Sequence, residues 1–149
     1  MKSTLLLLFL GTLLFAGCVS NNSTGLVTAT QAESTSIPIP VSEITTTAKW
    51  FEYESSGTII RFFAVKASDG TIRTAFDACD VCFASKKGYR QEGDVMVCNN
   101  CGNKYPVNGL GTENKKGGGC WPGYLPSKVI NDNLIINKTD LDNGRYRFV

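Results

Sequence analysis

Five cysteines in the second half of the chain are the residues whose type and spacing could do chemistry. Four of them form two CxxC pairs, Cys79 with Cys82 and Cys98 with Cys101, separated by fifteen residues. Two residues between ligands allow one tight turn to place both sulfurs on a single ion. Two such turns facing each other make a tetrahedral four-sulfur site, which suits zinc, a single iron or an iron–sulfur cluster. The spacing therefore predicts a metal centre at these four cysteines.

The two turns differ in the residue that follows them. Gly102 comes directly after Cys101, whereas Phe83 comes after Cys82. Glycine adopts a positive φ without a steric penalty, so it removes the side-chain clash in such a turn. We expect the second pair to form the more regular metal-binding turn.

Cys120 allows two interpretations. It follows three glycines, residues 117–119, and precedes Trp121. Glycines let a backbone approach a neighbour closely, so this loop could cover the metal with Cys120 as a spare or exchanging fifth ligand. Alternatively, Cys120 is a small buried residue beside a core tryptophan. Three aromatic residues could either pack over the metal site or simply belong to the hydrophobic core: Tyr89, Tyr105 and Trp121.

Disulfides are the main alternative to a metal, because oxidising compartments favour them in exported proteins. Because five is an odd number, disulfides could pair four of these cysteines and would leave the fifth unpaired. The chain has no histidine, which removes Ser-His-Asp hydrolysis, His-ligated catalytic zinc and the mixed His/Cys Rieske cluster. An all-thiolate shell tends to close a zinc site. Electron transfer is therefore a better fit than hydrolysis, and an electron carrier or metal-binding protein a better fit than an enzyme.

The first 17 residues have the features of an export signal. Lys2 is followed by an apolar run, Leu5 to Phe15, and eleven residues at about 1.5 Å each are too short for a hydrocarbon core of about 30 Å. The run ends in Ala16-Gly17-Cys18, which resembles the lipobox of prokaryotic lipoproteins, although Phe15 replaces the usual leucine. The resemblance implies cleavage before Cys18 and lipidation of its sulfur, so the protein would be anchored to the extracytoplasmic face of the cell membrane.

A tether and one domain are predicted after the anchor. Between Val19 and Thr47, twelve of twenty-nine residues are Ser or Thr and no aromatic occurs. Such a segment buries too little apolar area to fold, so residues 18–47 are expected to be a disordered tether. Residues 48–149 are expected to be the domain, with fourteen Lys/Arg against eleven Asp/Glu. This net charge of +3 is too small to indicate nucleic-acid binding.

The sequence of the domain predicts mostly β structure. Lys49 to Glu54 alternates polar and apolar residues, which is the period of a half-buried strand. Asp69-Gly70 predicts a hairpin turn between strands at 58–67 and 71–76. Strands at 128–130 and 134–136 are expected to form a second hairpin. Further strands are expected at 95–97 and 145–149, the last closing a sheet edge, and no segment predicts an amphipathic helix. We expect a small sandwich or barrel-like β domain with two CxxC metal turns.

Residues 76–126 resemble the FtrD-like family of membrane iron–sulfur-containing proteins. The matching segments are Phe76 to Cys82, Lys87 to Tyr89, Gly93 to Cys98, Asn100 to Gly102, and Gly118 to Pro122. The resemblance implies an extracytoplasmic domain that binds iron–sulfur or metal and is associated with iron uptake. There is also a faint likeness to Rieske domains, in which Cys82 and Cys101 would take the places of two histidines.

These patterns together predict a surface-anchored iron–sulfur or iron-binding protein acting in electron transfer or iron handling. Its partners would be the membrane, through the lipid, and a redox or metal-transport membrane protein. Two alternatives stay open: a binding module with a purely structural four-cysteine zinc site, and a chaperone for soft metal ions such as Cu(I).

Overall fold

The computed structural model describes residues 34–149. The predicted signal sequence, the lipidation site Cys18 and the tether up to residue 33 lie outside the described residues. Ten strands and one α-helix follow in the order β1 (Ser36–Pro40), β2 (Lys49–Ser55), β3 (Thr58–Lys66), β4 (Ile72–Cys79), β5 (Tyr89–Glu92), β6 (Val95–Cys98), β7 (Lys104–Pro106), β8 (Pro122–Tyr124), β9 (Lys128–Ile130), β10 (Asn133–Asn137) and α1 (Lys138–Gly144).

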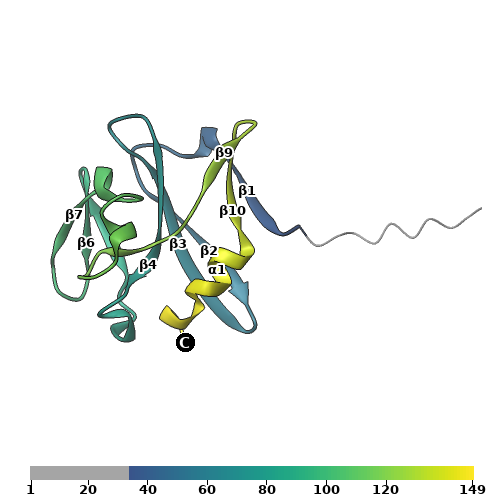
Figure 1. Cartoon of the computed structure of the whole chain (residues 1–149). Coiled ribbons are helices and arrows are strands. Elements are labelled where there is room, and N and C mark those ends of the chain that lie inside the picture. Colours follow the sequence, from purple (N-terminus) through teal and green to yellow (C-terminus); the bar gives the residue numbers. More distant parts are fainter. Residues whose placement is uncertain (1–33) are drawn as a thin grey trace, which may run out of the picture. The chain divides into compact units, whose positions relative to one another are not determined.

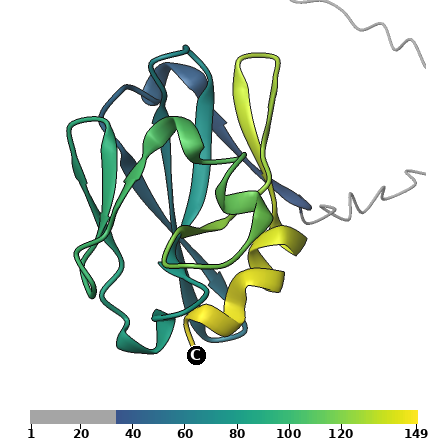
Figure 2. The same cartoon turned by 60° about the vertical axis from the view of Figure 1, so that its left-hand side comes forward.

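The strands form three antiparallel sheets, so the predicted mostly β class is confirmed. The sheet β2-β3-β4-β8 lies between the sheet β5-β6-β7 and the sheet β1-β10-β9, as Figures 1 and 2 show. The predicted hairpins also form: β3 pairs with β4, and β9 pairs with β10.

Strand β3 explains why the sequence from Thr58 to Lys66 is almost continuously apolar. Phe63 and Val65 point into a core shared with β5, β6 and β7, while Ile60 and Phe62 point into a second core shared with β1, β10 and α1. All four side chains are at most 1% exposed. Because successive strand residues face opposite sides, a strand buried on both faces needs apolar residues throughout. The central sheet therefore separates two cores, and the first of them contains Cys79 and Cys98.

The predicted start of the domain at residue 48 is too late. Strand β1 pairs with β10, with Ile37 opposite Ile136 and Ile39 opposite Leu134. Ile39 and Ile44 are 4% and 2% exposed in the second core. The prolines in β1 indicated an extended backbone, but they did not indicate which strand β1 pairs with. They are tolerated because β1 is an edge strand, which pairs with one neighbour only.

The C-terminal segment was predicted as a strand and is helical instead. Helix α1 is followed by a 3₁₀ turn, Arg145–Arg147. Leu141 is fully buried in the second core. Gly144 packs so closely on Phe76 that a Cβ there would lie 2.1 Å from Cζ of the ring. Arg145 is held by hydrogen bonds to Thr58 Oγ1 (3.1 Å) and the Ser56 carbonyl (3.3 Å), not by a strand ladder.

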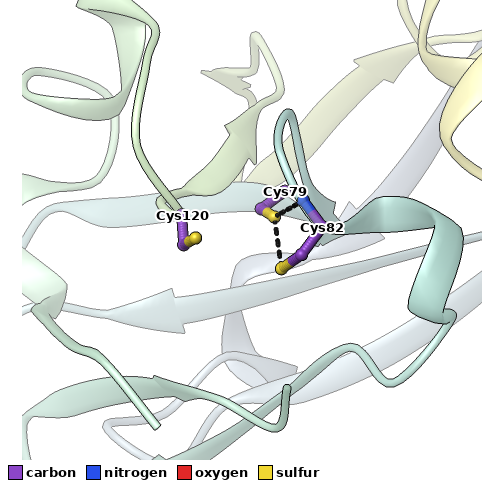
Figure 3. A group of neighbouring side chains, drawn as sticks. All are labelled: Cys79, Cys82 and Cys120. Carbon is purple, nitrogen blue, oxygen red and sulfur yellow. Dashed lines mark hydrogen bonds between the residues drawn. The ribbon is translucent and has the colours of Figure 1, made fainter. Parts of the chain in front are cut away.

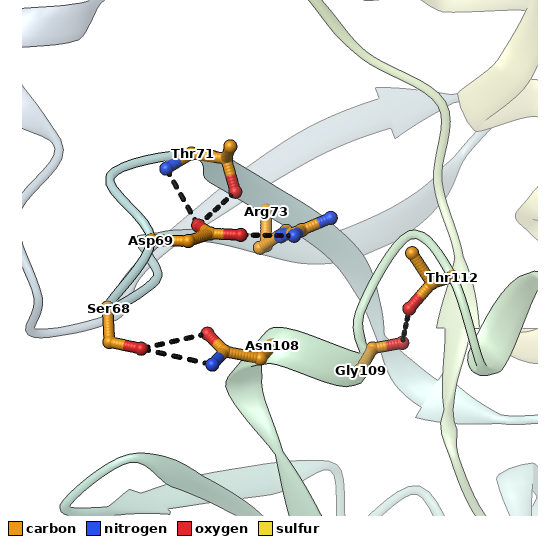
Figure 4. Close-up of polar contacts among 7 residues, drawn as sticks. All are labelled: Ser68, Asp69, Thr71, Arg73, Asn108, Gly109 and Thr112. Atoms are coloured by element: carbon orange, nitrogen blue, oxygen red, sulfur yellow. Dashed lines mark hydrogen bonds and ion pairs between the residues drawn. The ribbon is translucent and has the colours of Figure 1, made fainter.

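Polar contacts fix the turn between β3 and β4 to the segment after β7 (Figure 4). Asp69 accepts hydrogen bonds from the Thr71 backbone N–H (2.9 Å) and forms an ion pair with Arg73 (2.8 Å). The neighbouring Ser68 hydroxyl accepts a hydrogen bond from Asn108 Nδ2 (3.0 Å). The turn therefore joins the central sheet to the loop that continues towards Cys120. Within residues 34–149, no helix has the length and apolarity needed to cross a membrane.

Candidate metal centre

The ends of two packed sheets bring the cysteines together. Cys79 is the last residue of β4 in the central sheet, and Cys98 is the last residue of β6 in the sheet that packs against it. Both are 2% exposed and belong to the first core. Cys82 and Cys120 are half-buried against the same core, and Cys101 is exposed. The centre therefore lies at the rim of a core, with one side open to solvent.

The sulfur atoms are close neighbours. Cys79 Sγ and Cys82 Sγ are 2.8 Å apart, and Cys82 Sγ and Cys98 Sγ are 3.6 Å apart. The sulfurs of Cys79, Cys82 and Cys120 all lie within 4.8 Å of one another. Figure 3 shows Cys120 approaching the other two from the opposite side. Cys98 and Cys101 are not part of this group of three, but they lie beside it: the Cys98 sulfur is near that of Cys82, and the Cys101 thiol interacts with those of Cys98 and Cys120.

All five cysteines of the described part of the chain are free thiols. The two sulfur–sulfur distances above exceed the roughly 2.05 Å of a disulfide bond. The Cys82 sulfur is close both to Cys79 of its own CxxC turn and to Cys98 of the other CxxC turn. The arrangement is a cluster of thiols rather than a set of isolated pairs.

Backbone N–H groups point at the first sulfur of each CxxC turn. The N–H of Cys82 donates to Cys79 Sγ at 2.9 Å. The backbones of Asn100 and Cys101 donate to the sulfur of Cys98. Gly102 has a φ of +74°, and its N–H donates to the Cys98 carbonyl at 2.9 Å. The requirement for glycine after the second pair is therefore met, whereas the first pair continues into a 3₁₀ turn, Phe83–Ser85.

The thiols differ in their electrostatic surroundings. Burial raises the pKa of Cys82, and the adjacent sulfurs of Cys79 and Cys98 raise it further. Burial also tends to raise the pKa of Cys98, but hydrogen bonds from the backbones of Cys101 and Asn100 and from the neighbouring thiols together outweigh it, and the net pKa is lowered. Ionised sulfurs this close repel one another. A cation bound among them removes that repulsion, which is how metal binding and thiol deprotonation are coupled.

Both interpretations of Cys120 describe part of its surroundings. Its sulfur lies in the cluster, and the adjacent Trp121 packs against the ring of Tyr105, with 4.7 Å between centroids. The Tyr89 hydroxyl donates to the Cys120 carbonyl at 2.5 Å, which holds this loop over the site. Tyr89 and Tyr105 are 5% and 9% exposed, so they are core residues that also line the centre.

The glycines before Cys120 serve a different purpose from the one expected. Gly117 and Gly118 have φ values of +73° and +85°, and an added Cβ would meet nothing within 4 Å at either position. The loop therefore needs glycine for its left-handed backbone and not for a close approach to a neighbour.

The sequence contained no signal for one contact of the first CxxC turn. Arg147 forms an ion pair with Asp80, which lies between Cys79 and Cys82. The Arg147 guanidinium lies 5.0 Å from the ring centroid of Phe76, and its side chain is 10% exposed. Asp80 is separated from Arg147 by 67 residues, so spacing alone could not have indicated the pair.

The donor set fits an iron–sulfur cluster or a four-coordinate soft metal. Iron–sulfur clusters are bound by four cysteine thiolates, and structural zinc is bound in the same way. The cluster supplies five thiols, with half-buried or buried sulfurs at four of them. One more thiol is therefore present than either kind of centre needs.

Comparison with known families agrees with this geometry. The family model described as membrane iron-sulfur containing protein FtrD-like matches residues 44–148. No curated protein matches the chain.

Proposed function

The chain belongs to the FtrD-like family of membrane iron–sulfur-containing proteins, and from this premise we propose that it carries an iron–sulfur cluster or iron at the five-cysteine centre and acts in electron transfer or iron handling. Cys79, Cys82, Cys98 and Cys101 are the proposed ligands. Cys120 is proposed as a fifth thiol that lies beside the metal and can replace one of them.

The observation that carries this proposal is the convergence of five free thiols at one core rim. Cys79 and Cys98 come from different sheets, yet their sulfurs are bridged by the single sulfur of Cys82. A structural zinc site is satisfied by four thiolates and gains nothing from a fifth. A centre that changes its oxidation state or exchanges its metal can use an additional ligand.

The asymmetric burial of the centre suits electron transfer. Cys79 and Cys98 are buried against the core, which limits access of water to that side. Cys101 is exposed, so a partner could come close to the metal there. Burial and hydrogen bonds to the sulfurs are among the factors that set the potential of such a centre.

We place the protein at the extracytoplasmic face of the membrane through lipidation of Cys18, with a redox or metal-transport membrane protein as its partner. The support is the Ala16-Gly17-Cys18 sequence together with the membrane association of the family. The variant Cys18→Ser is expected to be released from membranes or to keep its signal uncut. Unchanged fractionation and an unchanged mass would contradict the lipid anchor.

The metal is tested by anaerobic purification followed by a visible spectrum and by analysis of iron, zinc, copper and acid-labile sulfide. Iron–sulfur centres and ferric thiolates absorb visible light, whereas zinc does not. A coloured protein with iron supports the proposal. A colourless protein with one zinc per chain would favour the structural zinc module, and bound copper would favour a soft-metal chaperone.

A further inference from the structure

A cavity of about 390 Å³ lies beside the cysteine centre. Its walls come from the start of β3, from the loop that follows Cys82, and from the C-terminal residues 147–149. Cys79, Cys82 and Cys98 are among its lining residues, whereas Cys101 and Cys120 are not. The cavity therefore approaches the centre from a different direction than the exposed Cys101.

The walls of this cavity are basic. They include four cationic side chains, Arg61, Lys86, Lys87 and Arg147, against the side chain of Asp77 and the α-carboxylate of Val149. The carboxylate of Asp77 already accepts a hydrogen bond from the Tyr89 backbone N–H at 2.7 Å.

Two of the cations have no acidic partner. Arg61 is paired with Glu52 and Arg147 with Asp80. Lys86 and Lys87, in contrast, form no ion pair within residues 34–149. Two lysines that line the same cavity and have no acidic partner favour a ligand that carries negative charge.

The loop that carries the two lysines is held in place. Asn99 donates from its side chain to the Lys87 carbonyl (2.9 Å) and from its backbone N–H to the Gly88 carbonyl (3.0 Å). Lys86 has a φ of +54°, a left-handed conformation that is uncommon for lysine. Such a conformation persists only where the surrounding contacts impose it. The backbone that carries the two lysines is therefore fixed relative to the cavity.

Apolar side chains also line the cavity. Ile59, Phe83 and Phe148 line the cavity, and Ile59 is 46% exposed although its side chain is large and apolar. The volume of this cavity falls within the range of small-molecule sites, and its walls combine charged groups with apolar side chains.

We propose that this cavity binds a small organic anion with carboxylate groups on an apolar body, with Lys86 and Lys87 facing the carboxylates and Ile59 and Phe148 facing the apolar part. The site goes beyond the proposed function, because it does not depend on which metal the cysteines bind. A ligand bound there would lie next to Cys79, Cys82 and Cys98.

Isothermal titration of the metal-loaded, anaerobically purified protein tests the proposal. The probes are phthalate, which carries two carboxylates on a ring, its uncharged diamide, and inorganic phosphate, which is an anion without an apolar body. The double variant Lys86→Gln/Lys87→Gln removes the charges. The control Lys115→Gln/Lys116→Gln removes the same number of charges from the chain's other lysine pair, which does not line the cavity. Metal content and thermal melting of each variant establish that it is folded.

We expect phthalate to bind the wild type and the control with the same affinity, and to bind Lys86→Gln/Lys87→Gln at least tenfold more weakly. The diamide should bind at least tenfold more weakly than phthalate. The proposal is overturned if phthalate gives no binding heat, if both double variants lose affinity equally, or if phosphate binds as tightly as phthalate. Because the heat does not depend on the metal's identity, a zinc-containing protein that binds phthalate would refute the iron assignment and leave this site intact.

Discussion

The ion pair between Arg147 and Asp80 should hold the first CxxC turn in its metal-binding conformation. Arg147→Met removes the charge and keeps most of the apolar volume. Removing one partner of a fully buried ion pair costs about 3–5 kcal/mol. Here the Arg147 side chain is 10% exposed, but that of Asp80 is 35% exposed. Water can therefore replace part of the lost interaction, and we expect a loss of about 2–3 kcal/mol in the free energy of unfolding.

Part of this expected loss of stability comes from cation–π contacts between the Arg147 guanidinium and two aromatic rings. The guanidinium lies 5.0 Å from the centroid of Phe76 and 4.4 Å from that of Tyr146, and cation–π contacts at exposed sites contribute about 0.5–1 kcal/mol each. Asp80 lies within the turn between two proposed ligands. Loss of groups that orient ligands typically lowers metal affinity by about 10–100-fold, so we expect an effect of this size on affinity too.

Anaerobic urea unfolding and chelator competition measure the two effects. Arg145→Met is the matched control, because Arg145 bonds Thr58 and Ser56 and contacts no cysteine-bearing turn. The reasoning is refuted if Arg147→Met lowers metal affinity no more than Arg145→Met does. Asp80→Asn should weaken affinity in the same direction, and the double variant should be less affected than the sum of the two single ones.

Three further predictions concern the scaffold. Deleting residues 19–33 should leave the melting temperature unchanged, whereas deleting residues 19–47 should lower it by about 10 °C or more. The reason is that the longer deletion removes Ile39 and Ile44, which are 4% and 2% exposed, and each buried isoleucine contributes about 1.5–3 kcal/mol. Equal melting temperatures for the two truncations would show that β1 adds nothing to the stability of the domain. Gly144→Ala should lower the free energy of unfolding in urea by about 1–3 kcal/mol, because the added Cβ would lie 2.1 Å from Phe76 Cζ. The control Asn143→Ala, at an exposed neighbouring position, should change it little. Similar losses for both variants would contradict the tight packing of Gly144 on Phe76. The Thr71 hydroxyl and N–H, together with Arg73, hold the pKa of Asp69 below its ordinary 3.8. The contribution of Asp69 to stability is therefore complete above that value and is lost as the pH falls through the lowered pKa. The difference in melting temperature between wild type and Asp69→Asn should be present at pH 7 and should shrink steadily as the pH is lowered below 3.8; a difference that does not change with pH would contradict the assignment.

Local patterns in the sequence were sufficient for the hairpins. Strands β3 and β4 are joined by Asp69-Gly70, and Gly70 has a φ of +81°, as the turn requires. The CxxC pairs are equally local, so their candidacy as metal ligands needed only spacing. The geometry adds that the two turns face each other, since Cys82 and Cys98 sulfurs are 3.6 Å apart.

Pairings between distant segments could not be predicted in the same way. Strand β1 pairs with β10, about a hundred residues later, and its serine and two prolines resemble the composition of the tether before it. Helix α1 has seven residues, which is about two turns and too short to show a clear apolar period. The contacts that fix its end, Gly144 on Phe76 and Arg147 on Asp80, depend on the packed structure.

Metal content of the five single Cys→Ser variants, purified anaerobically beside the wild type, tests the central claim most directly. We expect Cys79→Ser, Cys82→Ser, Cys98→Ser and Cys101→Ser to lose iron and to melt at a lower temperature. The reason is that metal binding to four thiolates contributes on the order of 10 kcal/mol, comparable with the whole stability of a domain. Cys120→Ser should keep its iron while its visible spectrum changes. Full iron occupancy and a wild-type melt in all four of the former variants would contradict the account.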